Sequence, residues 1–102
     1  MKKLKTFETL STFDLKELGM YRFNQTNAYV GNNIIASYGL IVAINKNGRW
    51  YSSDGKHNYS KTTSKQVTQI TRVDTRQRKK TWNIINESEF LKMVNKKINI
   101  LK

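Results

Sequence analysis

The chain contains no cysteine and no proline, and its five glycines are dispersed over 102 residues. Without cysteine, disulfides, thiol chemistry and cysteine-ligated metal sites are excluded, so apolar packing must hold the fold together. Without proline, and with its glycines dispersed, the chain has no linker composition that would separate two domains. We therefore expect residues 1–102 to form a single domain.

Long apolar runs are also missing. The longest, Leu40–Ile44, is far shorter than the roughly 20 residues that span a bilayer. The first five residues include three lysines, as at the start of a signal peptide, but an acid follows at Glu8 and no apolar segment does. We expect a cytoplasmic protein without a membrane partner.

Groups that could carry out catalysis are scarce. His57 is the single histidine, and the seven acids are scattered, with Glu87 and Glu89 better explained as first-turn charges of a helix. The sequence has no HExxH, DxDxDG, GxGxxG or GxxxxGK motif. We therefore expect no enzyme activity, no metal site and no cofactor.

The N-terminal half indicates one helix followed by a meander of strands. A capping box from Ser11 to Asp14 and a stop at Gly19 predict a helix over 12–18. Short apolar runs between turn residues then predict strands at Met20–Phe23, Ala28–Val30, Ile34–Ile44 and Arg49–Ser52.

The strongest local signal is Asn47-Gly48, because these residues tolerate the positive φ of a tight hairpin. With strict alternation, the hairpin has apolar residues on both faces, which is typical of a sheet covered on both sides. The expected faces are Val42, Ile44, Arg49 and Tyr51 on one side, and Ile41, Ala43 and Trp50 on the other.

The C-terminal half indicates helices and one more strand. Thr63 and Gln66 form a plausible cap for a helix over 64–72, although threonine richness also suits a strand. A polar, basic segment at 74–80 leads to a strand at 82–85, and Asn86 or Ser88 then caps a helix over 87–97. The fold class we predict is α+β: a small antiparallel sheet centred on the 38–52 hairpin, flanked by two to three short helices.

Charge is the feature that points to a partner. Lysine and arginine outnumber aspartate and glutamate by 19 to 7, and residues 19–80 hold eleven of these bases against two acids. Such a field attracts polyanions, of which nucleic acid is the commonest in a cell. We predict non-catalytic binding of nucleic acid, DNA or RNA, mainly through phosphate contacts.

Three groups of residues are candidates for that contact. The run of bases at 76–80 would contact phosphates through its charge without reading bases, and a solvated surface loop is the alternative interpretation. The hydroxyls and lysines of 61–65 could hold a phosphate at a helix start, with ordinary capping as the alternative. Aromatic residues next to bases, at 21–23, 49–51 and 80–82, could form a stacking surface on a sheet, although we expect Trp50 and Trp82 to be needed for the core. The predicted contacts are Arg72, Arg76, Arg78, Lys79 and Lys80, then Lys61, Thr62, Thr63 and Lys65, then Arg49 and Tyr51.

Residues 36–72 also resemble a known family. Ser37 to Ile44, Gly48 to Tyr51 and Tyr59 to Lys65 are similar to small uncharacterised proteins carried by phages and mobile elements of Gram-positive bacteria. In those proteins an S-Y-x-T-x-V-A strand precedes a Y-S-x-T-T-S-K segment. Here Leu40 replaces the small polar residue of the strand.

The resemblance implies a phage or prophage setting inside a bacterial host cell, with no catalytic residues to carry over. Small phage proteins often act on host machinery, including CRISPR nucleases. An alternative function is therefore an anti-CRISPR-like or nuclease inhibitor that binds a host nucleic-acid-processing complex. Ser60, Thr62 and Thr63 are positions to test for either function.

Overall fold

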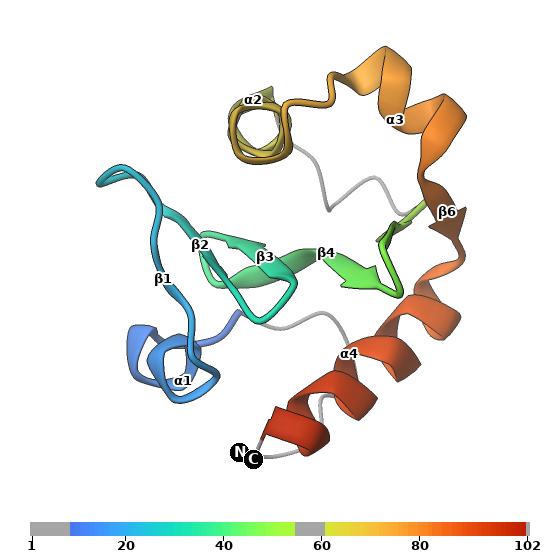
Figure 1. Ribbon diagram of the computed structural model, residues 1–102. Helices are drawn as coiled ribbons and strands as arrows, with labels where there is room; N and C mark the ends of the chain where they lie inside the picture. Colours follow the sequence, from blue (N-terminus) through green and yellow to red (C-terminus); the bar gives the residue numbers. More distant parts are fainter. Residues whose placement is uncertain (1–8, 55–60, 102) are drawn as a thin grey trace.

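A computed structural model describes residues 9–54 and 61–101, which form a sheet between two layers of helices (Figure 1). Helices α2 and α3 lie on one side of the sheet, and α1 and α4 on the other. The elements, in chain order, are α1 (Thr12–Glu17), β1 (Tyr21–Arg22), β2 (Ala28–Gly31), β3 (Ile34–Ser37), β4 (Leu40–Lys46), β5 (Arg49–Ser53), α2 (Lys61–Thr71), α3 (Thr75–Thr81), β6 (Asn83–Ile85) and α4 (Glu87–Leu101).

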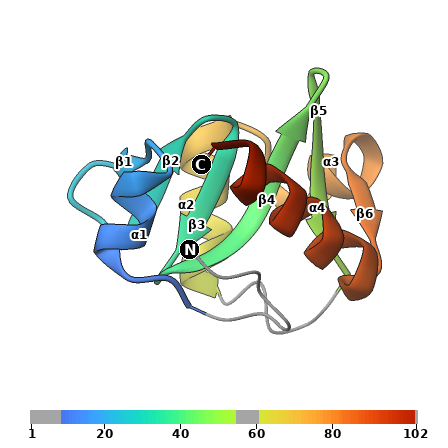
Figure 2. The same ribbon diagram turned by 90° about the horizontal axis from the view of Figure 1, so that it is seen from below.

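The six strands lie in sequence order, β1-β2-β3-β4-β5-β6. Neighbours from β1 to β5 are antiparallel, whereas β6 is parallel to β5. The parallel pair requires a crossover, and α2 and α3 provide it. Seen from below, α1 and α4 cover the near face of the sheet and α2 lies behind it (Figure 2). The α+β prediction is confirmed, although the described residues form four helices and the sheet is mixed rather than purely antiparallel.

The β4–β5 hairpin confirms the turn predicted at Asn47-Gly48. Asn47 has φ 55° and Gly48 φ 83°, and Lys46 pairs directly with Arg49. A two-residue loop with both central φ values positive is the I′ type, whose twist matches that of the strands it joins.

The run at 34–44 was expected as one strand, and this expectation is wrong. Tyr38 and Gly39, with φ 53° and 83°, form a turn that separates β3 from β4. The register of the two strands then shifts between Ile35 and Ala36, which leaves Val42 as an extra residue on β4. A bulge of this kind breaks strict alternation.

The bulge moves two residues to the faces opposite to those predicted. We call the side of the sheet that α1 and α4 cover the lower side, and the side that α2 and α3 cover the upper side, as in Figure 1. Ile41 lies with Ile44 in the core below the sheet, while Val42 lies with Ala43 in the core above it. Tyr51 lies with Ile44 and Trp50 with Ala43, as predicted.

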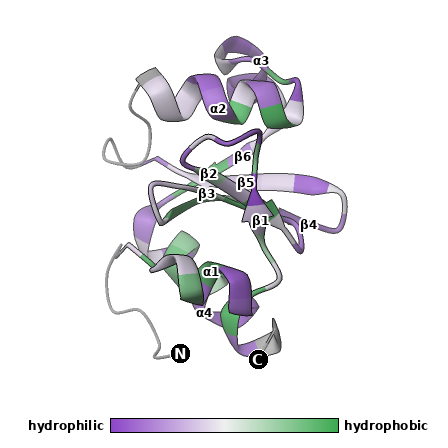
Figure 3. Cartoon of the chain, turned by 90° about the vertical axis from the view of Figure 1, so that its left-hand side faces the viewer, coloured by the Kyte–Doolittle hydropathy of each residue, from purple (hydrophilic) through white to green (hydrophobic). Residues whose placement is uncertain are grey.

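Each helical layer seals its own apolar core, and Figure 3 shows the two layers on either side of the sheet. Below the sheet, Phe90 and Val94 of α4 are 0% and 1% exposed and pack with Leu15 of α1. Above the sheet, Val67 of α2 and Trp82 pack on the strands. The sheet is therefore covered on both faces, as the apolar pattern of the hairpin predicted.

Helix ends follow the predicted caps at two of the three sites. The Ser11–Asp14 capping box is present at α1, and the Asn86 side chain accepts a bond from the Glu89 amide at 2.8 Å at the start of α4. The predicted cap at Thr63 is not formed, because α2 already begins at Lys61.

The basic segment expected at 74–80 is a helix, α3, over 75–81, and its run of bases is not a solvated loop. Asp74 caps α3 by accepting a bond from the Gln77 amide at 2.8 Å. The sequence pattern lacked apolar residues at helical spacing here, so it gave no helix signal.

We expect Gly39→Ala to lower the free energy of unfolding by about 2–3 kcal/mol, at the upper end of ordinary substitutions. A Cβ there would lie 2.5 Å from the Leu10 carbonyl oxygen, in a residue with φ +83°. Gly48→Ala is the matched control, because Gly48 has the same φ and a Cβ added to it would meet no atom of the described residues within 4 Å. The control should lose only about 1 kcal/mol from backbone strain. Equal losses in urea denaturation would show that the contact with Leu10 does not matter.

Candidate functional site

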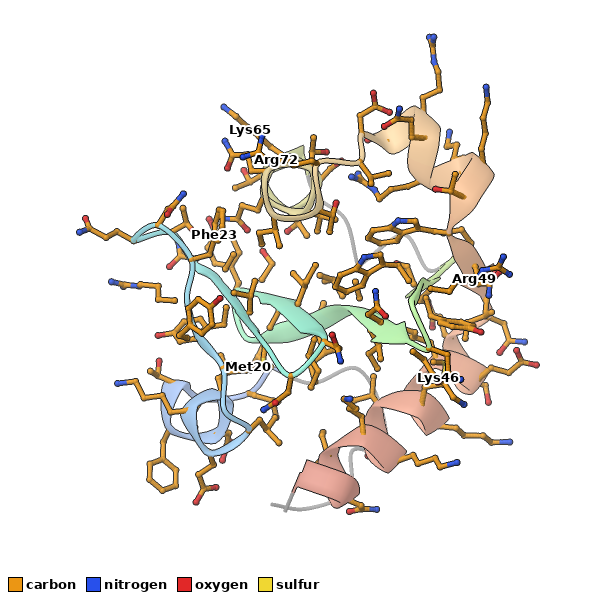
Figure 4. The ribbon with its side chains drawn as sticks, in the orientation of Figure 1. Met20, Phe23, Lys46, Arg49, Lys65 and Arg72 are labelled. Carbon is orange, nitrogen blue, oxygen red and sulfur yellow. The ribbon has the colours of Figure 1, made fainter. Side chains whose placement is uncertain are left out.

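The outer face of α2 carries an exposed polar stripe. Thr62, Lys65, Gln69 and Arg72 recur every three or four residues and are all exposed. Arg72 follows the last residue of the helix with φ 60°, and its amide donates to the Thr68 carbonyl at 2.7 Å. In Figure 4, Lys65 and Arg72 lie on the side of α2 away from the sheet.

Helix α3 continues this surface with three more cations. Arg76, Lys79 and Lys80 are exposed, and their spacing places them on one face of the helix. Neither helix contains an acid, and Asp74 between them is engaged as the cap of α3. We call Thr62, Lys65, Arg72, Arg76, Lys79 and Lys80 the α2–α3 surface.

Arg78, predicted to contact phosphate, is instead buried with 5% of its surface exposed. Its guanidinium donates to the Ser64 and Thr68 hydroxyls at 2.7 and 2.9 Å. It also donates to the Val73 carbonyl at 2.7 Å and the Thr75 hydroxyl at 3.0 Å. Arg78 therefore joins α2 to α3, and we remove it from the predicted contacts.

The aromatic neighbours of Arg78 belong to the same packing. Its guanidinium carbon lies 5.7 Å from the centre of the Trp82 ring, a cation–π distance. Trp82 stacks on Trp50 with ring centres 5.4 Å apart. These tryptophans contribute to the core, as expected.

Thr63 also faces inward and is 6% exposed. Its hydroxyl lies 3.0 Å from that of Ser37, which donates to the Gln66 side-chain oxygen at 2.8 Å. This buried network fastens α2 to β3, so Thr63 is not available to a ligand and is removed from the contact set. The side chain of Lys61, and all of Ser60 and His57, lie outside the described residues.

Arg49 and Tyr51 do not join the α2–α3 surface. Tyr51 packs against the core below the sheet, on the side opposite to α2. Arg49 is exposed beside the hairpin turn, and Figure 4 shows it at the far end of the molecule from Lys65 and Arg72. The predicted stacking face is therefore separate from the predicted phosphate contacts.

A groove adjoins the α2–α3 surface, with a volume of about 770 Å³. The turn between β1 and β2 forms one wall, and α2 with the start of α3 forms the other. We call it the β1–β2 groove. Its lining residues are Phe23, Asn24, Thr26, Thr68, Gln69, Arg72, Asp74 and Gln77.

Phe23 belongs to the 21–23 stretch that the sequence offered for base stacking, but Asn24 and Gln69 were missed as candidate site residues. No local pattern marks them, because the two walls of the groove are more than 40 residues apart in the chain. The one available signal was the pair of polar residues Asn24-Gln25 between two β-type runs, which predicts a turn and no more.

A second, smaller cavity of about 290 Å³ lies between the hairpin and α4. Among the described residues that line it, Ile44 and Met93 are apolar, the others are lysines and asparagines, and none is an acid. The sequence predicted no site here either. The polar lining residues are Asn33, Asn45, Lys46, Asn47, Lys96 and Lys97.

Neither a membrane span nor a metal cluster stands out in the part of the chain that the structure describes. No helix there has the length and apolar character to cross a bilayer. Among the same residues, no three His, Cys, Asp or Glu side chains come together as metal ligands would.

These features define a small, strongly basic α+β protein in which the layer of α2 and α3 carries a cationic surface. The chain belongs to a family of unknown function, DUF8033, whose model matches residues 2–87. The match includes residues 36–72 and extends on both sides of them. Comparisons with curated proteins and with solved structures gave no match.

Proposed function

We propose that this protein binds nucleic acid without catalysis, through phosphate contacts of the α2–α3 surface. The observation that carries the proposal is the exposure of five cations: Lys65, Arg76, Lys79 and Lys80 on two adjoining helices that contain no acid, and Arg72 directly after the first of them. Lysine and arginine neutralise phosphates and release counterions, which favours binding of a polyanion regardless of its sequence.

The way in which α2 and α3 are joined supports the proposal. Arg78 donates to hydroxyls at 2.7 Å and 2.9 Å on α2 and at 3.0 Å on α3. Ser64 and Thr75 also bond each other across the two helices at 3.0 Å. The cations therefore project from a fixed scaffold, so little freedom of the backbone is lost when a ligand binds.

The test is the salt dependence of binding to labelled DNA and RNA, measured by fluorescence anisotropy. The variant Arg76→Gln, Lys79→Gln, Lys80→Gln should bind at least tenfold more weakly in about 0.1 M salt. Its log–log salt slope on duplex DNA should be shallower by about 2.7, at about 0.9 for each lost phosphate contact.

The matched control is Lys16→Gln, Lys92→Gln, Lys96→Gln. It removes the same charge from exposed positions on α1 and α4, across the sheet from the α2–α3 surface. Its Kd should change by less than threefold. Equal weakening by both variants would mean that net charge alone attracts the ligand, and no binding to any nucleic acid would overturn the proposal.

The second candidate function is a phage-encoded inhibitor that binds a host nucleic-acid-processing complex, such as a CRISPR effector. The similarity of residues 36–72 to phage and mobile-element proteins supports that setting. Exposed rings support a protein contact, because aromatic side chains are enriched at interfaces: Phe13, Tyr21 and Tyr38 are 69%, 64% and 56% exposed. Co-purification of one host complex that survives the Arg76, Lys79 and Lys80 variant would favour this function over direct binding.

A further inference from the structure

We propose that the β1–β2 groove takes an unpaired nucleobase, so that the preferred ligand is single-stranded nucleic acid. This inference rests on the proposed function and specifies its ligand. A base inside a duplex is paired and stacked, whereas an unpaired base can turn away from its strand and enter a side groove.

Phe23 supplies a ring on which a base can stack. It is half-buried, packs against the core above the sheet, and also lines the groove beside Arg72. Its backbone is held on both sides: its amide donates to the Ala28 carbonyl at 2.8 Å, and its carbonyl accepts from the Thr26 hydroxyl at 2.6 Å. In Figure 4 the labelled Phe23 lies between the β1–β2 turn and α2.

Amide side chains line both walls of the groove. Asn24 comes from the turn, Gln69 from α2 and Gln77 from α3. Asn and Gln side chains can donate to and accept from the edge of a base, as they do with adenine. The groove therefore offers hydrogen bonding on two walls around one ring.

The turn that presents Asn24 has an uncommon backbone. Asn24 and Gln25 follow one another with φ 45° and 58°, in the left-handed region that residues other than glycine seldom adopt. Thr26 holds this turn, since its amide donates to the Phe23 carbonyl at 2.9 Å and its hydroxyl accepts from the Ala28 amide at 3.1 Å.

The charged residues indicate that the groove and the α2–α3 surface bind different parts of the ligand. Asp74 lines the groove, and its negative charge disfavours a phosphate there, whereas a carboxylate can accept from the amino group of a base. Arg72 belongs to both the groove and the α2–α3 surface. A strand whose phosphates follow α2 can therefore place one base in the groove while Arg72 binds the adjoining phosphate.

The experiment compares three labelled nucleic-acid probes of about twelve nucleotides, a length within the site sizes of single-strand binders. They are a single strand with bases, the same sugar–phosphate chain without bases, and a duplex. The native protein should bind the base-bearing strand about tenfold more tightly than the abasic chain. Phe23→Leu keeps an apolar side chain against the core and should abolish that difference, while leaving duplex and abasic binding within about twofold of the native protein.

Tyr21→Leu is the matched control, because Tyr21 is an exposed ring on β1 that does not line the groove. Gln69→Ala, on the exposed face of α2, is the second variant and should weaken the base-bearing strand alone. Equal binding of the base-bearing and abasic chains would overturn the groove inference while leaving the phosphate-contact proposal intact. Absence of binding to all three probes would overturn both.

Discussion

Arg78→Met is expected to lower the free energy of unfolding by about 3 kcal/mol, because each charged hydrogen bond is worth about 1.5–3 kcal/mol and part of that gain is offset by the cost of burying the charge. Methionine preserves the unbranched apolar stem beside Trp82 but removes every donor. The Ser64, Thr68 and Thr75 hydroxyls and the Val73 carbonyl all lose a guanidinium bond of 3.0 Å or less.

Lys79→Met is the control for this change. It removes the same charge from the neighbouring residue, which is exposed on the α2–α3 surface. Urea denaturation should show a loss of less than about 0.5 kcal/mol for Lys79→Met. If Arg78→Met were as stable as Lys79→Met and instead reduced nucleic-acid binding, Arg78 would be a ligand contact and not a structural residue.

Phe90→Ala is expected to lower the free energy of unfolding by about 3–5 kcal/mol, the range for truncating a buried phenylalanine. Phe90 is 0% exposed and lies in the core that α1 and α4 form below the sheet. The small residue leaves a cavity because the surrounding sheet and helices relax only in part. That loss is a large share of the stability of an ordinary domain.

Phe90→Leu separates loss of volume from loss of the ring. It should cost less than about 1.5 kcal/mol, since much of the buried volume is kept. Neither variant touches α2 or α3, so the folded fraction should bind nucleic acid with unchanged affinity. A change in the affinity of Phe90→Leu would mean that the lower core determines the shape of the α2–α3 surface.

Three features that lie within about four residues of one another were predicted correctly from sequence. The Ser11–Asp14 capping box, the Asn47-Gly48 turn and the Asn86 cap each depend on one side chain and a nearby backbone group. Their energy is local, so the tertiary structure did not override it.

Features that depend on distant packing were not predictable. Arg78 is a charged residue of the interior, and reasoning from polarity places such residues in solvent. The bulge at Val42 is equally invisible, because the apolar run from Leu40 to Ile44 looks the same with or without it.

The candidate site was also predictable only in part. The clustering of bases at 61–80 is visible in the sequence, and helical spacing then exposes Arg76, Lys79 and Lys80 while Arg78 points inward. The groove could not be found, because Phe23 and Gln69 meet only when α2 packs above the sheet beside the β1–β2 turn.

The crossover from β5 to β6 has a mechanical consequence. The segment that carries α2 and α3 leaves the sheet after Ser53 and returns at Asn83, and these two strands are hydrogen-bonded neighbours. Closing a loop of this length costs roughly 3 kcal/mol of chain entropy, and the cost is met when the sheet forms. Both ends of the segment that carries α2 and α3 are therefore anchored at neighbouring strands, so a force that separates β5 from β6 also acts on the chain that carries the two helices.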